Sequence, residues 1–215
     1  MARFTNQAQL RYGNAVTNSN IAVGEILEVL SATKTAVRNT YGQSDTVTYI
    51  VSIVNSGTTP ITGISVTDNL GEYTFGTTTL VPLTYIDGTV KYYVNGVLQP
   101  SVVVTAGPPL VVSGITVPAG GSVTVAYEAA VNEFAPLDTT SVINNTAIVA
   151  GTGITPITAE EEITVESTPV LTITKSVSPV PVTENGTLTY TFLIQNSGNV
   201  AADASTGVVV TDVFD

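Results

Sequence analysis

Three polar side chains, those of Lys34, Asp68 and Asn145, occur in segments where every second residue is apolar. This alternation predicts a strand with one face in the core, so each side chain is expected to point into a hydrophobic interior. The alternating segments cover residues 30–36, 64–68 and 143–149. Burying a lone ammonium or carboxylate is costly unless the group is paired or neutralised. The three side chains are therefore expected to meet one another.

Two kinds of chemistry would satisfy them. One is a buried, hydrogen-bonded Lys–Asp–Asn cluster. The other is a spontaneous isopeptide bond, with Lys34 as the nucleophile, Asp68 as the proton relay and Asn145 as the electrophile. An apolar setting lowers the pKa of a lysine and so favours the neutral, attacking amine. A protonated aspartic acid would polarise the carboxamide and shuttle protons while ammonia leaves.

The same residue types recur near the two ends of the chain. Lys175 lies on the alternating face of residues 171–177, and Asp212 lies on that of residues 208–212. Asn6 lies far away, on the alternating face of residues 4–12. If the amino-terminal strand of one subunit closed the carboxy-terminal strands of another, these three side chains would meet between subunits. Lys175, Asp212 and Asn6 are therefore a candidate intermolecular isopeptide set.

An internal repeat relates the two sets. Three matches share one and the same offset along the chain: Lys34 with Lys175, Tyr49 with Tyr190, and Asn55-Ser56-Gly57 with Asn196-Ser197-Gly198. Residues 4–8 resemble residues 143–147, which lie near the end of the repeat that begins before Lys34. The matches predict an amino-terminal closing segment at 1–28, a complete repeat at 29–168, and the opening strands of a second, incomplete repeat at 169–215.

The order of these segments along the chain predicts how subunits would associate. A half-sandwich exposes an apolar face and unpaired strand edges, and the segment 1–28 is the closing strand that such a unit lacks. Strand donation into the next subunit would complete it. The contact is head-to-tail, so it propagates into a filament, a homopolymer of this chain, rather than closing into a ring. The alternative is a piece cut from a longer tandem array.

The expected fold class is all-β, an immunoglobulin-like β-sandwich. Period-2 alternation runs through most of the chain, for example over residues 46–53 and 188–194, and no amphipathic helical pattern competes with it. Asp87-Gly88 and Asn95-Gly96 are typical of two-residue hairpin turns. Pro118-Ala119-Gly120-Gly121 predicts a turn before a strand at 122–131.

Composition excludes several classes of function. The 215 residues include no Cys and no His, which removes thiolate nucleophiles, Ser-His triads and the common zinc sites; we expect no cofactor and no metal. The net charge of −11 argues against nucleic acid as a partner, since phosphate binding needs a basic face. No apolar run reaches membrane-spanning length, so no membrane insertion is expected. No signal peptide is recognisable at the amino terminus.

The Lys34, Asn55-Ser56-Gly57 and Val66-Thr67-Asp68 motifs, with the Pro118 turn and Asn145-Thr146-Ala147, resemble a widespread prokaryotic surface repeat. It is the domain of unknown function that stands eleventh in its series. The resemblance implies an immunoglobulin-like sandwich in stalks, fibres or surface layers, without catalysis on external substrates. The order Lys, Asp, Asn is also similar to that of the A-type domains of collagen-adhesin pilins.

These observations predict a structural protein rather than an enzyme. The expected role is a subunit of an extracellular or cell-surface filament, with a spore surface as one location, assembled by strand complementation and reinforced by Lys–Asn bonds. The alternative role is a stalk or ligand-binding module of a tandem-repeat surface adhesin.

Overall fold

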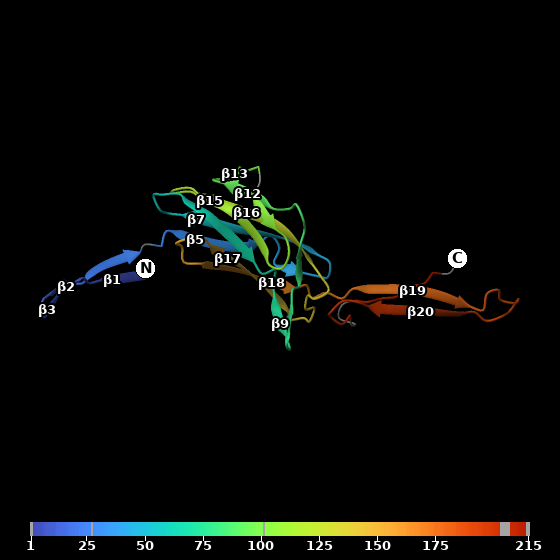
Figure 1. Ribbon diagram of the computed structural model, residues 1–215. Helices are drawn as coiled ribbons and strands as arrows, with labels where there is room; N and C mark the ends of the chain where they lie inside the picture. Colours follow the sequence, from blue (N-terminus) through green and yellow to red (C-terminus); the bar gives the residue numbers. More distant parts are fainter. Residues whose placement is uncertain (1, 27, 101, 203–206, 214–215) are drawn as a thin grey trace.

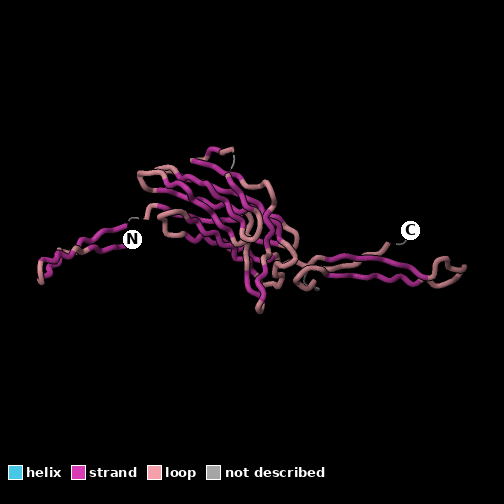
Figure 2. The backbone as a smooth tube through the Cα atoms, in the orientation of Figure 1, coloured by secondary structure: helices cyan, strands magenta, loops and turns pink. Residues whose placement is uncertain are grey.

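The computed structural model describes residues 2–26, 28–100, 102–202 and 207–213. Met1 and Asp215, the outer limits of the predicted domains, lie outside the described residues. Every regular element in these ranges is a strand (Figure 2). A β-sandwich occupies the middle of the molecule, and one hairpin extends from it on each side (Figure 1). The described ranges hold no helix long and apolar enough to cross a membrane.

The first sheet of the sandwich has the strand order β13-β12-β16-β7-β5, with β11 also paired to β16. Its strands are β5 (Leu30–Ala36), β7 (Thr46–Asn55), β11 (Leu83–Tyr85), β12 (Lys91–Val94), β13 (Val97–Leu98) and β16 (Ser122–Val131). The second sheet has the order β14-β15-β8-β17-β18-β6. Its strands are β6 (Thr40–Tyr41), β8 (Ile61–Asp68), β14 (Val103–Thr105), β15 (Leu110–Val117), β17 (Val142–Ala150) and β18 (Ile157–Val165).

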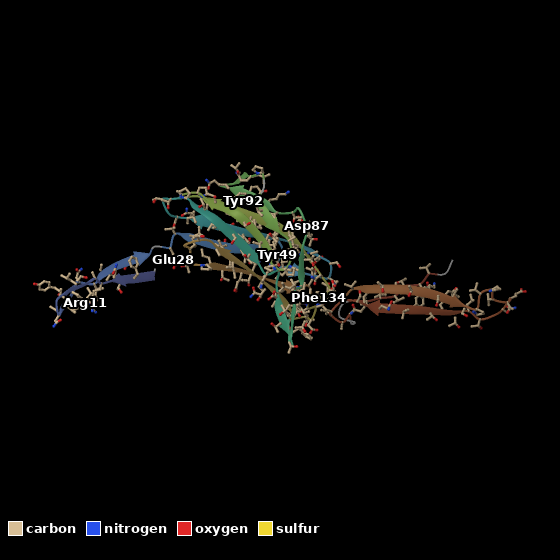
Figure 3. All side chains as sticks on the ribbon, in the orientation of Figure 1. Arg11, Glu28, Tyr49, Asp87, Tyr92 and Phe134 are labelled. Carbon is tan, nitrogen blue, oxygen red and sulfur yellow. The ribbon has the colours of Figure 1, made fainter. Side chains whose placement is uncertain are left out.

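The core lies between these two sheets and follows the alternation in the sequence. In β7 and β16, every second side chain is buried, because successive residues of a strand point to opposite faces. Tyr49, labelled in Figure 3, lies inside the sandwich in this way. β8, β15, β17 and β18 contribute the facing layer, with Ile64, Ile115 and Ile163 fully buried. The prediction of an all-β, immunoglobulin-like sandwich is confirmed.

Two turn predictions had different outcomes. Asn95-Gly96 joins β12 to β13, which pair directly through Val94 and Val97. The hairpin predicted at Asp87-Gly88 is wrong, because the strands on either side of it, β11 and β12, do not pair with each other. Both pair with β16 instead, since this 10-residue strand is long enough to hold them one after the other along its length.

The amino-terminal extension is a hairpin of four strands. β1 (Ala2–Asn6) pairs with β4 (Ala22–Ile26), and beyond it β2 (Gln9–Tyr12) pairs with β3 (Ala15–Asn18). The pairing register shifts by one residue between Asn6↔Ala22 and Gln9↔Asn18, and the extra residue lies in the returning strand, between Asn18 and Ala22.

The remaining elements are two further hairpins. β9 (Tyr73–Phe75) and β10 (Thr78–Leu80) pair in a short hairpin that projects from the sandwich (Figure 1). β19 (Leu171–Ser178) and β20 (Thr189–Asn196) form the carboxy-terminal hairpin. Residues 207–213, which follow it, adopt no regular strand.

The two extensions reproduce strand pairs of the sandwich in register. Lys175 lies opposite Phe192 in the carboxy-terminal hairpin, as Lys34 lies opposite Val51 between β5 and β7, and the repeat offset is the same for both partners. Asn6 likewise lies opposite Ala22, as Asn145 lies opposite Glu161 between β17 and β18, again with one offset for both partners. The carboxy-terminal hairpin therefore has the pairing of the strands that open the sandwich. The amino-terminal hairpin has the pairing of those that end it.

Candidate functional site

A connected group of polar side chains lies between the two sheets of the sandwich. Lys34 on β5 donates a hydrogen bond to Asp68 Oδ2 at the end of β8, with an Nζ–Oδ2 distance of 2.5 Å. The Tyr127 hydroxyl on β16 donates to the same Oδ2, also at 2.5 Å. Asn145 on β17 donates through Nδ2 to the Tyr127 hydroxyl at 3.3 Å. The structure thus brings together all three residues predicted from the sequence and adds Tyr127.

These groups are removed from solvent. Lys34, Asp68 and Asn145 are 4%, 1% and 0% exposed. Burial lowers the pKa of Lys34 from 10.5 to about 8, even though Asp68 acts in the opposite direction by stabilising the ammonium. The Lys34 ammonium also lies 4.9 Å from the centre of the Tyr49 ring. A lysine with this pKa has a substantial neutral fraction near physiological pH, which an amine nucleophile requires.

The Asn145 carbonyl is held by a turn that follows Asp68. Gly71 N–H donates to Asn145 Oδ1 at 3.2 Å, and Asp68 Oδ1 accepts the Leu70 N–H at 3.0 Å. Asn69 Oδ1 accepts N–H groups from Gly71 and from Thr146, the neighbour of Asn145. The turn therefore fixes β17 to the end of β8 at the position of the carboxamide.

Gly71 is required in this turn for two reasons. Its φ of +74° lies in the left-handed region, which a residue without a Cβ adopts at little cost. A Cβ added there would also lie 2.6 Å from Ile143 Cγ2. The backbone consequently approaches β17 closely enough for its N–H to reach Asn145.

Two tyrosine rings form a wall of the site. Tyr49 and Tyr127 are stacked, with ring centroids 5.7 Å apart. Burial raises the pKa of both phenols well above the usual 10, so both are neutral hydroxyls across the physiological range. The Tyr49 hydroxyl lies near Asn145, but within the described part of the chain it forms no hydrogen bond of normal geometry. Tyr127 alone of the two connects Asp68 to Asn145.

The second predicted set is only partly assembled within one chain. Lys175 Nζ lies 2.5 Å from Asp212 Oδ1, with side chains 39% and 25% exposed. The ammonium lies 4.5 Å from the centre of the Tyr190 ring, the counterpart of Tyr49. Asn6 is on β1, opposite Ala22, in the hairpin on the other side of the sandwich (Figure 1). The chain therefore forms the Lys–Asp pair but does not bring Asn6 to it.

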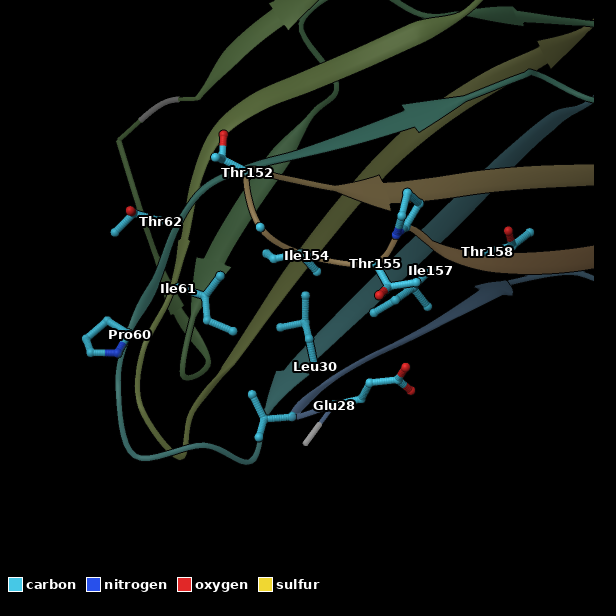
Figure 4. A pocket seen from close by; sticks show the side chains of 13 residues that line it. Glu28, Leu30, Pro60, Ile61, Thr62, Thr152, Ile154, Thr155, Ile157 and Thr158 are labelled. Atoms are coloured by element: carbon cyan, nitrogen blue, oxygen red, sulfur yellow. The ribbon is translucent and has the colours of Figure 1, made fainter. Parts of the chain in front are cut away.

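A pocket of about 660 Å³ lies at the end of the sandwich where the amino-terminal hairpin joins it. Figure 4 shows Leu30, Ile61, Ile154 and Ile157 as its apolar lining, with Glu28 at one side. The remaining lining comes mainly from threonines and prolines of the adjoining loops. It is a groove with a single carboxylate and lies apart from the buried polar group.

Sequence reasoning missed Tyr127 and Gly71. Tyr127 falls on the buried face of β16 with Val125 and Ala129, so the alternation places its ring in the core. A buried phenol needs a partner for its hydroxyl, and this was the available signal. The contribution of Gly71 is a backbone N–H and leaves no side-chain signal in the sequence.

No protein-family model matches the chain, and no curated protein matches it as a relative. Among solved structures, a variant of BcpA, the major pilin subunit of Bacillus cereus, has a TM-score of 0.52 at 11% identity, covering 91% of this chain and 64% of that one. The full-length major pilin SpaD from Corynebacterium diphtheriae has a TM-score of 0.48 at 16% identity, covering 74% of this chain and 40% of that one.

The pilus backbone protein RrgB from Streptococcus pneumoniae has a TM-score of 0.44 at 14% identity, covering 56% of this chain and 31% of that one. The chain thus spans between 31% and 64% of the length of these three structures. At these sequence identities a structural similarity indicates a shared fold only. The evidence for that fold is the similarity to the BcpA variant. The chain has the immunoglobulin-like β-sandwich fold found in that pilin subunit.

Proposed function

We propose that this protein is a structural, non-enzymatic subunit of a surface filament outside the cell, assembled head-to-tail from copies of the same chain. The observation that carries the proposal is the register match of the two extensions. The carboxy-terminal hairpin supplies counterparts of β5 and β7, and residues 2–26 supply counterparts of β17 and β18. Residues 208–212 match the end of β8 in sequence. In the sandwich, β8 and β17 are adjacent and paired. One end of a subunit therefore fits beside the other end of a second subunit.

The exposed apolar side chains support this docking. In the carboxy-terminal hairpin, Ile173 and Val177, on the Lys175 face, are 53% and 38% exposed. In the amino-terminal hairpin, Phe4, on the Asn6 face, is 56% exposed. Covering apolar surface contributes about 25 cal/mol for each Å² removed from water. The joined ends would form a small sandwich, with the two strands of residues 171–196 in one layer and the amino-terminal hairpin, beside residues 208–212, in the other.

The buried polar group supports a covalent reinforcement of each subunit. Lys34 attacks the Asn145 carboxamide, Asp68 handles the proton, and one ammonia is lost. The amide would join β5 in one sheet to β17 in the other. Docking of the two ends would place Asn6 beside Lys175 and Asp212, so the same reaction would then join neighbouring subunits.

Denaturing mass spectrometry with a boiled detergent gel tests both parts. A subunit lighter by one ammonia, and unaltered in mass after Lys34→Ala, supports the internal bond. A ladder of multimers that survives boiling and disappears in Asn6→Ala supports the bond between subunits. The matched control is Asn14→Ala, in an exposed turn of the same hairpin, which should keep the ladder. Subunits of full mass that remain monomeric by electron microscopy would contradict the proposal.

The pocket lined by Leu30 and Ile154 favours a second candidate, a ligand-binding module of a surface adhesin. Its volume of about 660 Å³ lies in the range of small-ligand pockets, which combine apolar side chains with polar groups that orient the ligand. This candidate predicts a protein that stays monomeric and loses binding when Ile154→Arg fills the pocket. Filament formation that is unaffected by Ile154→Arg favours the first candidate.

A further inference from the structure

Tyr127 stands between the two groups that must exchange a proton if the internal bond forms. Its hydroxyl donates to Asp68 Oδ2 at 2.5 Å and accepts from Asn145 Nδ2 at 3.3 Å. Asn145 Nδ2 is the atom that leaves as ammonia. Among the described residues, Asp68 accepts hydrogen bonds from Lys34, Tyr127 and the Leu70 N–H. The hydrogen-bonded path from the carboxylate to the leaving nitrogen therefore passes through a phenol hydroxyl.

We propose that Tyr127 is the proton relay to the leaving ammonia, and that the Gly71 N–H stabilises the oxyanion on Asn145. The inference rests on the proposed Lys34–Asn145 bond. It assigns the groups that allow the tetrahedral intermediate of that reaction to lose ammonia. An uncharged phenol suits the role because it can accept one proton and release another without becoming an ion. An N–H already directed at the carbonyl oxygen stabilises the charge that develops there.

The reaction begins within the ion pair. The Lys34 ammonium transfers a proton to Asp68 Oδ2, which gives a neutral amine and a carboxylic acid. Nζ then attacks Cγ of Asn145, an N–C bond forms, and the carbonyl π electrons move onto Oδ1. Gly71 N–H, at 3.2 Å from Oδ1, faces that oxyanion.

Breakdown of the intermediate uses the relay. Asp68 gives its proton to the Tyr127 oxygen while the Tyr127 hydroxyl turns and gives its own proton to Nδ2. The C–Nδ2 bond breaks, the carbonyl reforms, and ammonia leaves. The extra proton on Nζ returns to the Asp68 carboxylate. The products are one amide, one ammonia and a protonated Asp68, whose proton leaves with the ammonia as ammonium.

Tyr41 provides a control for this role. Like Tyr127, it is fully buried and its hydroxyl donates a hydrogen bond at 2.5 Å, but the acceptor is Pro136 O. Tyr41→Phe therefore removes a buried hydroxyl that lies outside the polar group. Tyr127→Phe removes the relay and leaves the Lys34–Asp68 pair in place.

The experiment refolds the full chain from unfolded inclusion bodies, quenches samples over time and measures the loss of ammonia by mass spectrometry. Tyr127→Phe should slow the loss about 100-fold or more, the usual effect of a positioned acid–base group. Tyr41→Phe should react at nearly the rate of the unaltered chain. Circular dichroism on the same samples separates slow reaction from failed folding.

A second measurement needs no variant. A relay moves two protons together, so the rate in mixtures of H2O and D2O should curve with the deuterium fraction, whereas transfer of one proton gives a straight line. If the rate falls in a straight line with the deuterium fraction, or if Tyr127→Phe reacts at the unaltered rate, the relay is wrong. The proposed Lys34–Asn145 bond is not affected by either result. Equal slowing in Tyr41→Phe also overturns the relay, since the loss of any buried hydroxyl would then be the cause. If the unaltered chain keeps its full mass, the Lys34–Asn145 bond does not form, and both the bond and the relay are wrong.

Discussion

Asn55 and Asn196, which the internal repeat relates to each other, form the same two hydrogen bonds. Asn55 Oδ1 accepts the Gly57 N–H at 2.9 Å, and its Nδ2 donates to Thr59 O at 2.8 Å. Asn196 repeats the pattern with Gly198 at 3.0 Å and Val200 at 2.7 Å. Each also makes a bond that the other lacks. Asn55 Nδ2 donates to Pro118 O at 3.0 Å, from the turn before β16, and Asn196 Oδ1 accepts the Val170 N–H at 3.1 Å.

This difference predicts unequal effects of the same substitution. Asn55→Ala should lower the free energy of unfolding by about 2–3 kcal/mol, because buried backbone groups lose their partner. Asn196→Ala, at an exposed position, should lower it by less than about 1 kcal/mol. Urea unfolding followed by circular dichroism measures both. Equal effects would mean that the turn at Pro118 adds nothing to the Asn55 site.

Asp68 should be the most costly member of the polar group to remove. Asp68→Ala leaves the Lys34 ammonium buried without its partner, and breaking a buried pair in this way costs about 3–5 kcal/mol. The comparison is best made in an Asn145→Ala background, where no amide can form and only the pair is tested. Asp212→Ala, which breaks a partly exposed pair, should cost no more than about 1 kcal/mol. A cost of similar size at both sites would contradict the role of burial.

The pH dependence of stability should have a maximum near pH 10 in the same Asn145→Ala background. The folded-state pKa of Lys34 is lowered from 10.5 to about 8, so between these values the unfolded chain binds more protons and stability rises with pH. The rise should reach at most about 3 kcal/mol. Above pH 10 the sign reverses, because burial keeps Tyr49 and Tyr127 protonated in the folded state while they ionise in the unfolded chain.

Lys34→Met provides the control for that profile. It should abolish the rise between pH 8 and pH 10 and keep the fall above pH 10. Urea midpoints measured at intervals of half a pH unit are sufficient to show this. A flat profile in the parent would indicate that Lys34 keeps its ordinary pKa.

Phe4 should be needed for assembly but not for the fold of the sandwich. It corresponds to the buried Ile143, and its ring covers Gly24 on β4, where an added Cβ would lie 2.2 Å from it. Phe4→Ala should therefore raise the protein concentration needed for filaments by about tenfold or more, the equivalent of burying one large side chain. Light scattering with electron microscopy measures this concentration.

Val23→Ala is the matched control for Phe4→Ala. Val23 is 62% exposed in the same hairpin and lies opposite Thr5, so it is on the other face. It should leave assembly unchanged. If Val23→Ala weakens assembly and Phe4→Ala does not, the hairpin docks through the opposite face.

Much of the polar group could be predicted from the sequence, because alternation fixes which face of a strand a residue occupies. Lys34, Asp68 and Asn145 interrupt apolar faces, and close packing leaves few places for such groups except against one another. Tyr127 could not be assigned a role in the same way, since an aromatic residue on a core face is ordinary. Its contact with Asp68 depends on how β16 and β8 face each other across the sandwich, which is a long-range property.

The amino-terminal segment shows a different limit. Alternation over residues 4–12 does not predict the one-residue register shift between the β1–β4 pair and the β2–β3 pair. Register depends on which residues of the returning strand pair with each position, and nothing within residues 4–12 specifies that. The strands β3 and β4 provide this information, and their pairing is visible only in three dimensions.

The chain enters the sandwich on β5 and leaves it from β18, with the two extensions on opposite sides (Figure 1). A pulling force along the molecule would therefore act between Leu30 and Val165 and load the strands between them in shear. An amide between Lys34 and Asn145 would carry that load directly from β5 to β17. Residues 35–144, most of the sandwich, would then lie outside the load path and stay folded under tension.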